Sequence, residues 1–134
     1  MAKILVVDDD VEAAETLALL LELSGHDAHV AHGGRQAIDA WSEHRHDVVF
    51  LDLGLPDVDG FDVARTIRDA QELEPPLVVA VTGQGTEVVP LTKQCGFDGY
   101  LQKPAVASAV MAEVDRVLRA PRTTAAAVSP TATA

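Results

Sequence analysis

Short apolar runs alternate along this chain with longer segments in which apolar residues recur at helical spacing. Three runs, at residues 4–7, 48–51 and 77–81, are continuously apolar, as expected of strands buried on both faces of a parallel sheet. Two further strands are predicted from weaker patterns. Residues 28–31 carry a polar histidine, which favours an edge position, and residues 99–102 form a short last strand.

Helices are predicted between and after these strands. The clearest covers residues 11–23, and its apolar stripe comprises Val11, Ala14, Leu17, Ala18 and Leu21. Another helix opens after Gly33, and two more are predicted over residues 61–71 and 106–119. The alternation gives five βα units, which predicts an α/β fold: a three-layer, doubly wound (βα)5 domain with a five-stranded parallel sheet.

The chain of 134 residues has the length of one domain with an ordinary hydrophobic core. We assign residues 1–119 to this domain. Residues 120–134 are rich in alanine, threonine and proline and contain few large apolar side chains. Such a composition predicts a disordered tail or the start of a linker.

The net charge, the cysteine count and the first apolar run narrow the possible partners and location of the protein. A net charge of −11 argues against nucleic acid, because phosphate backbones are bound by clustered lysine and arginine, and favours metal ions or basic protein surfaces. Cys95 is the only cysteine, so no internal disulfide can form, and we expect a small buried apolar side chain. The first apolar run is too short for a signal peptide or a membrane span, so we expect a soluble, cytoplasmic protein without membrane association.

Polar side chains suited to chemistry follow four of the predicted strands. Asp8 and Asp9 follow the first strand, and Asp52 follows the third. Thr82 follows the fourth strand, and Lys103 follows the last. Because the carboxyl ends of parallel strands meet at the same edge of a sheet, we expect these five side chains to converge on one pocket.

Three carboxylates in one pocket should attract a cation. At a separation of about 4 Å and an effective dielectric constant of about 20, each pair repels by about 4 kcal/mol. Oxygen ligands suit Mg²⁺, with Mn²⁺ as a substitute. Beside such a metal, Asp52 can act as a nucleophile toward a phosphoryl group and form an acyl phosphate, while Lys103 and Thr82 contact the phosphoryl oxygens.

Four motifs carry a resemblance to a known family. They are VVDDD with its acidic pair, FLDLGLPDVDG with Asp52, AVTG with the threonine and YLQKP with the lysine. Through them residues 3–119 resemble the receiver domain of two-component response regulators. The resemblance implies that Asp52 is phosphorylated by a histidine kinase or a histidine phosphotransfer protein. It also implies a Mg²⁺ site made by Asp8, Asp9 and Asp52 together with the backbone carbonyl of Gly54.

The resemblance further implies how the domain signals. Thr82 and Tyr100 are expected to shift together on phosphorylation, with Gly60 and Pro104 in supporting positions and a cis peptide bond before Pro104. The implied strand order is 2-1-3-4-5. The surface formed by the fourth helix, the fifth strand and the fifth helix would then control a downstream protein or form a homodimer. The chain is expected to be a single-domain regulator or a receiver excised from a hybrid kinase.

One segment departs from the family pattern. The stretch between Thr82 and Lys103 is slightly shorter than in the family and contains Pro90. Because proline lacks a backbone donor and clashes with the preceding turn, the fourth helix is expected to be short, kinked or late to start. The partner kinase is expected to dock near the start of the first helix and the loop after Lys103.

Several of these residues also allow a simpler structural interpretation. Acids that precede a helix commonly act as N-caps, and Asp9 with Glu12 resembles a capping box. Taken alone, Thr82 would be a loop hydroxyl, Lys103 a solvated charge and Tyr100 a core aromatic. The chain also contains five histidines, which we interpret as exposed polar residues and not as metal ligands: His26, His29, His32, His44 and His46.

Two other functions compete with the receiver hypothesis. A haloacid-dehalogenase-like phosphatase would use Asp8 as nucleophile and Asp10 as general acid. That hypothesis leaves Asp52 unexplained, and the acidic pair expected after the lysine is absent. The other alternative is a degenerate receiver that binds partners without being phosphorylated, which the complete set of five residues argues against.

Overall fold

The computed structural model describes residues 2–69, 76–83 and 89–119. Its five parallel strands form one sheet in the order β2-β1-β3-β4-β5, which confirms the predicted order. The strands are β1 (Lys3–Val7), β2 (Asp27–Ala31), β3 (Val48–Asp52), β4 (Leu77–Thr82) and β5 (Gly99–Gln102). The helices in the described ranges are α1 (Val11–Leu23), α2 (Gly34–His44), α3 (Gly60–Arg68), α4 (Val89–Gln94) and α5 (Ala107–Arg119).

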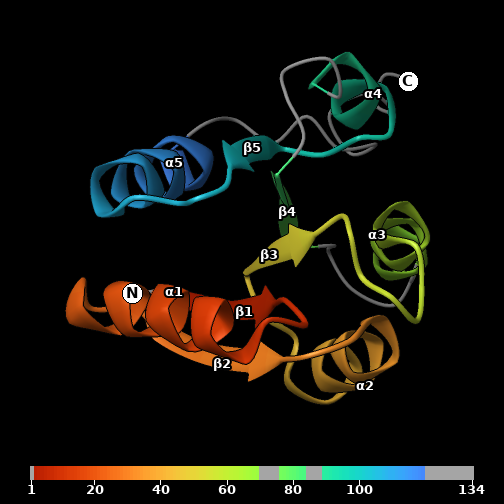
Figure 1. The fold of residues 1–134 in the computed structure, drawn as a ribbon, viewed down its shortest axis with the longest axis horizontal. Helices are drawn as coiled ribbons and strands as arrows, with labels where there is room; N and C mark the ends of the chain where they lie inside the picture. The colour runs from red at the N-terminus through yellow and green to blue at the C-terminus, as the bar shows by residue number, and fades with distance from the viewer. Residues whose placement is uncertain (1, 70–75, 84–88, 120–134) are drawn as a thin grey trace, which may run out of the picture.

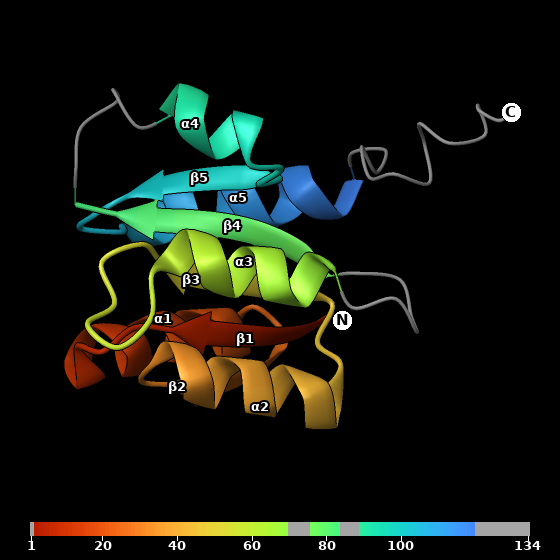
Figure 2. The same ribbon diagram turned by 90° about the vertical axis from the view of Figure 1, so that its right-hand side faces the viewer.

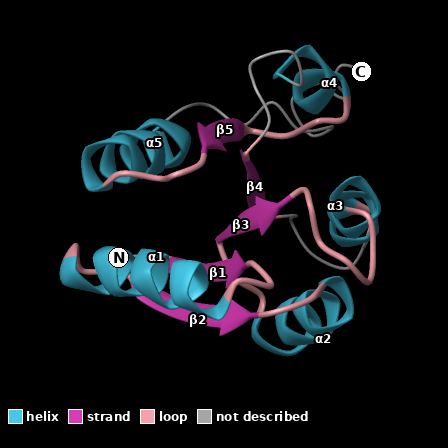
Figure 3. Ribbon diagram, viewed as in Figure 1, coloured by secondary structure: helices cyan, strands magenta, loops and turns pink. Residues whose placement is uncertain are grey.

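Helices cover both faces of the sheet and make the fold three-layered. Figure 1 shows α1 and α5 on one face and α2, α3 and α4 on the other, and Figure 3 shows the same arrangement by secondary structure. Alternate residues of β1 point into the two cores. Ile4 and Val6 pack with α1 and α5, whereas Leu5 and Val7 pack with α2 and α3. A strand buried on both faces must be apolar throughout, which is why the central runs lack polar alternation.

Strand register brings the carboxyl ends of the central strands together. The visible arrows of β1, β4 and β5 point to the same edge in Figure 2. Val7 of β1 is paired with Leu51 of β3, so the residues that follow them are neighbours across the sheet. Asp52 is paired in turn with Val81, next to the end of β4. The predicted meeting of strand ends is therefore present.

The helix boundaries refine the sequence-based prediction. Asp10, not Asp9, caps α1, because its side chain accepts a hydrogen bond from the backbone N–H of Ala13 at 3.2 Å. Helix α3 ends at Arg68, and residues 70–71 of the predicted helix lie outside the described ranges, as does the predicted tail. Helix α4 is short, as expected, and Pro90 occupies its first turn, where a missing N–H costs no intrahelical bond.

Two predictions about side-chain burial are wrong. Cys95 is exposed, because it follows α4 at a point where Thr92 and Phe97 occupy the inward positions. His46 is only 3% exposed, and its Nε2 lies 3.0 Å from Nδ1 of His29 on β2. His44 completes the group, with ring centroids 5.1 to 6.0 Å apart. We call His29, His44 and His46 the histidine cluster.

The outer side of β5 is covered by side chains of α5. Glu113 accepts a hydrogen bond from the backbone N–H of Tyr100 at 2.9 Å. Arg116 donates to Glu113 at 2.8 Å and to the backbone carbonyl of Asp98 at 2.7 Å. The Glu113 carboxylate lies so close to Gly99 that a Cβ at this position would have to displace it. Among the described residues, no helix has the length and apolar character needed to cross a membrane.

Candidate phosphoacceptor site

Two neighbouring strands position the acidic residues of the candidate site. Asp52 is the last residue of β3, whose five residues are all buried, and Asp8 comes directly after β1. Both aspartates are only 6% exposed. Because β1 and β3 are adjacent in the sheet, the two side chains emerge side by side at its carboxyl edge.

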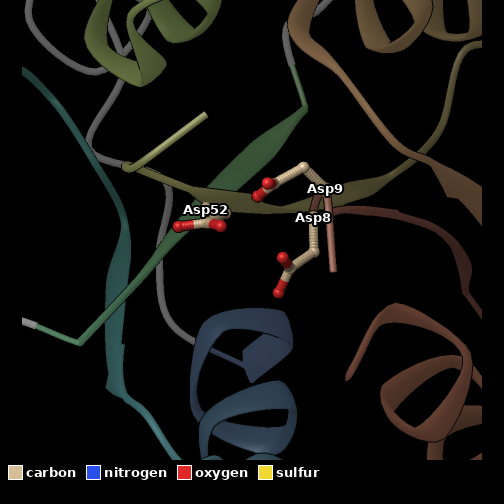
Figure 4. A group of neighbouring side chains, drawn as sticks. All are labelled: Asp8, Asp9 and Asp52. Carbon is tan, nitrogen blue, oxygen red and sulfur yellow. The ribbon is translucent and has the colours of Figure 1, made fainter. Parts of the chain in front are cut away.

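The carboxylates of Asp8, Asp9 and Asp52 surround one small space. One oxygen from each lies within 4.8 Å of the others, and Figure 4 shows the three groups gathered around this space. In the described part of the chain this is the only group of at least three acidic, histidine or cysteine side chains with that geometry. The sequence-based prediction of a carboxylate cluster therefore agrees with the structure.

Lys103 bridges two of the three acids. Its Nζ lies 3.0 Å from Oδ2 of Asp8 and 3.1 Å from Oδ2 of Asp52. Burial alone would lower the pKa of Lys103, but its hydrogen bonds to the two carboxylates outweigh this effect, so that its pKa lies above the usual value. The ammonium therefore remains charged and can neutralise an anion placed between these groups.

One lysine does not balance three carboxylates. Burial raises the pKa of Asp8 above the usual 3.8, and the nearby charge of Asp52 adds to this effect. The backbone N–H of Asp10 and the ammonium of Lys103 offset it only in part. A divalent cation would remove the remaining penalty, and the oxygen-only donor set suits Mg²⁺ or Mn²⁺. The residues present therefore fit the predicted metal.

Thr82 and Tyr100 lie on the strands beyond Asp52. Thr82 ends β4 and is only 3% exposed, and its backbone carbonyl accepts the N–H of Lys103 at 2.8 Å. A backbone hydrogen bond thus links Thr82 directly to Lys103. Tyr100, on β5, is half-buried against the core shared with α2 and α3. It also lines a cavity of about 310 Å³ between α4 and α5. Their predicted joint movement stays a prediction.

The supporting residues lie close to Asp52. The backbone N–H of Gly54 donates to Asp52 Oδ1 at 2.9 Å, and the role predicted for its carbonyl stays a prediction. Gly60 begins α3 where a Cβ would lie 2.8 Å from Cα of Leu53 and 3.0 Å from the Asp52 carbonyl oxygen. The Lys103–Pro104 peptide bond is cis, as the resemblance implied.

Asp57 makes a contact that the sequence does not predict. This residue lies in the loop between β3 and α3, and its carboxylate accepts the backbone N–H groups of Gly34 at 2.9 Å and Arg35 at 3.3 Å. These hydrogen bonds lower the pKa of Asp57 below its usual value. Its partners lie 22 and 23 residues earlier in the chain, so no local sequence pattern could reveal them.

A cavity of about 520 Å³ opens beside the site. Its charged lining residues are Asp8, Asp10, Glu12 and Lys103. Its remaining wall includes Ala13, Thr16, Leu17 and Leu20 of α1, with Pro104 and Ala105 of the loop before α5. Val11 and Val106, which are sequence neighbours of the lining residues Asp10 and Ala105, are 50% and 55% exposed. The site therefore adjoins an accessible, partly apolar groove.

The geometry does not favour the phosphatase alternative. Asp10, the general acid of that hypothesis, is exposed and caps α1. The bridging lysine instead joins Asp8 to Asp52, a residue for which the phosphatase hypothesis has no role.

Comparison with known proteins agrees with this geometry. Residues 4–115 match the family model of the response regulator receiver domain. The DNA-binding response regulator MtrA of Mycobacterium tuberculosis is 39% identical over 117 residues, which are 87% of this chain and 50% of that protein. The response regulator MprA of Mycolicibacterium vanbaalenii is 36% identical with the same coverage. The chain thus spans about half the length of these relatives.

Solved structures show the same fold. The chemotaxis response regulator CheY4 of Vibrio cholerae superposes with a TM-score of 0.81 and 26% identity, covering 87% of this chain and 98% of that chain. A receiver domain from Methylobacillus flagellatus is 32% identical with a TM-score of 0.75. The sequence match, the shared fold and the acidic site at the carboxyl edge lead to one conclusion: this chain belongs to the response regulator receiver domain family.

Proposed function

We propose that the chain is a phosphorylation-operated switch in two-component signalling, with Asp52 as the phosphoacceptor. One observation carries the proposal. A buried aspartate at a strand end shares one lysine with a second buried aspartate, at 3.1 and 3.0 Å, inside a cluster that fits a divalent cation. Family membership supports the same role. The chain would thus act as a signalling domain and not as a turnover enzyme.

In the proposed reaction Asp52 receives a phosphoryl group from phosphohistidine. A carboxylate oxygen of Asp52 attacks the phosphorus, the P–N bond breaks, and the released imidazole takes up a proton. Lys103 already contacts Asp52 and would neutralise one phosphoryl oxygen of the acyl phosphate. Thr82, at the adjacent strand end, would donate its hydroxyl hydrogen to another. Such reactions depend mainly on positioning and charge neutralisation, which are the tasks these residues can perform.

A divalent cation would supply most of the remaining charge neutralisation. Asp8, Asp9 and Asp52 would hold Mg²⁺ together with the backbone carbonyl of Gly54, and Mn²⁺ could replace it. Since Lys103 is the single cation in contact with these acids among the described residues, the cluster without metal keeps a net negative charge. That charge would repel an incoming phosphoryl group, so phosphorylation should require the metal.

The phosphodonor is proposed to be a histidine kinase or a histidine phosphotransfer protein. The groove of about 520 Å³ beside the site supports a docking position, since it joins the acids to apolar side chains of α1. Val11 and Val106, next in sequence to the lining residues Asp10 and Ala105, add exposed apolar side chains. A helical partner could bury these side chains while it presents its phosphohistidine to Asp52.

The signal is proposed to leave through α4, β5 and α5. Thr82 ends β4, which pairs with β5, and Tyr100 on β5 faces the cavity between α4 and α5. A shift of both residues on phosphorylation would change this surface, which a downstream protein or a second copy of the chain would recognise. MtrA is named as a DNA-binding protein. The net charge of −11 leads us to propose that this chain itself does not contact nucleic acid. We also propose that it acts in the cytoplasm, a reducing compartment that its single cysteine suits.

Phosphorylation by a small phosphodonor tests the proposal. The protein is incubated with acetyl phosphate and Mg²⁺, and its intact mass is measured. We expect one added phosphoryl group on the wild type and on the matched loop variant Asp59→Asn, but none on Asp52→Asn or without metal. An adduct that persists in Asp52→Asn, or its absence from the wild type, would refute the assignment.

A further inference from the structure

The loop that follows the acceptor is tied to a helix distant from it in the chain. This acceptor loop comprises residues 53–59, between β3 and α3. The Asp57 carboxylate accepts the first N–H groups of α2, from Gly34 at 2.9 Å and from Arg35 at 3.3 Å. Unpaired N–H groups at a helix start favour a negative charge, so the contact is favourable for α2 as well as for the loop.

Helix α2 has no cap of its own. The residue at its N-cap position is Gly33, which makes no side-chain capping hydrogen bond. A Cβ at Gly33 would lie 3.1 Å from the Asp57 carboxylate, and one at Gly34 would lie 2.7 Å from Cβ of Val58. Because a side chain at Gly34 would collide with Val58, the start of α2 is shaped to receive the acceptor loop.

The same loop holds a backbone contact to the acceptor. The backbone N–H of Leu53 donates to the Val81 carbonyl at 3.1 Å, which fixes the beginning of the loop on β4. The N–H of Gly54 then donates to Asp52 Oδ1 at 2.9 Å. At the far end, Asp59 caps α3 through the N–H of Phe61 at 2.8 Å. Asp57 is thus the polar anchor between these two ends.

We propose that Asp57 is a positioning residue for phosphorylation: by fastening the acceptor loop to α2, it keeps the Gly54 backbone aligned with Asp52. The inference rests on the proposed function of Asp52 and concerns a residue that does not touch the phosphoryl group. The carboxylate of Asp57 stays ionised because the two N–H donors lower its pKa. Apolar contacts of Leu55 and Val58 hold the loop in the core, and Asp57 fixes its orientation.

Asp59 provides a matched control in the same loop. Asp57 and Asp59 are both exposed aspartates that cap a helix, but Asp59 caps the helix directly after it, whereas Asp57 caps a helix earlier in the chain. Asp57→Ala and Asp59→Ala should therefore destabilise the protein to a similar extent. Only Asp57→Ala should release the acceptor loop from α2.

The test combines a rate with a backbone signal. We expect Asp57→Ala to slow phosphorylation by acetyl phosphate about tenfold, because small displacements of positioning groups strongly reduce rates. Asp59→Ala should stay within about twofold of the wild type. Asp57→Asn keeps an oxygen for the Gly34 N–H and should restore most of the rate. In ¹⁵N–¹H spectra, the Gly54 amide peak should shift in Asp57→Ala and stay in place in Asp59→Ala.

The outcomes separate this inference from the proposed function. A wild type that accepts no phosphoryl group would refute the proposed function, while the Gly54 amide peak would still test the anchoring. An unchanged rate and an unchanged Gly54 peak in Asp57→Ala would overturn the inference, and so would equal rate losses in the two alanine variants. If Asp57→Ala does not fold, Asp57→Ser, whose hydroxyl is too short to reach both N–H groups, takes its place with the same expectations.

Discussion

Acidification should destabilise this domain through the buried His46. Burial and the nearby charges of His29, Lys3 and His44 lower its pKa from the usual 6.5 to about 4. The unfolded chain, with the ordinary pKa, therefore binds the proton first as the pH falls. The contribution of His46 to stability is complete above about pH 6.5 and is lost progressively between about pH 6.5 and pH 4.

The size of the effect follows from the two pKa values. Each tenfold difference in proton affinity corresponds to about 1.4 kcal/mol. The interval from 6.5 to about 4 therefore amounts to about 3 kcal/mol of unfolding free energy, for a side chain that is only 3% exposed. Total stabilities of domains this size are about 5–15 kcal/mol, so the loss should be easy to measure.

Urea denaturation of the wild type and of His46→Phe isolates this contribution. Phenylalanine has a similar ring but does not titrate. The carboxylates are the same in both proteins, so their contribution cancels when the unfolding free energy of one protein is subtracted from that of the other. We expect that difference to change by about 3 kcal/mol in favour of His46→Phe between pH 7 and pH 4. A difference that stays constant within about 0.5 kcal/mol would refute the reasoning.

Two further predictions concern the candidate site. Gly60→Ala should lower the unfolding free energy by about 1–3 kcal/mol, because its Cβ would lie 2.8 Å from the Leu53 backbone, which cannot move aside easily. Gly83→Ala is the matched control, since a Cβ there meets nothing within 4 Å, and calorimetry of both variants decides the point. Mg²⁺ at about a hundredfold excess over its dissociation constant should stabilise the wild type by about 2.7 kcal/mol, seen as a higher melting temperature. Asp8→Asn should abolish that shift. Without metal this variant should be more stable than the wild type, because the raised pKa of Asp8 means that folding disfavours its ionised form. A metal-induced shift that survives in Asp8→Asn would contradict the site.

Local patterns were sufficient to predict the sheet and its acidic edge. The apolar runs ending at Val7 and Leu51 are contiguous in sequence, so burial on both faces could be inferred without any knowledge of their partners. Asp8 and Asp52 come directly after these runs, so the positions of the strands determine where the two carboxylates lie. Asp59 is similarly accessible to prediction, because the N–H that it caps lies two residues away.

Contacts between distant segments could not be predicted in the same way. The capping of α2 by Asp57 depends on how a loop packs against a helix 23 residues earlier. His46 resembles a polar loop residue in sequence, but the neighbouring β2 supplies His29 as a partner and makes its burial tolerable. Cys95 comes directly after a short helix, where Thr92 and Phe97 face inward in its place. Composition carries no information on which of these side chains is buried.

The Glu113–Arg116 pair beside β5 has a consequence for assembly. A terminal strand with free backbone donors can recruit a strand from another molecule, which is a common route to aggregation. Here a carboxylate from α5 already occupies the outward N–H of Tyr100. Partners are therefore expected to recognise this side of the domain through side chains and not by extending the sheet.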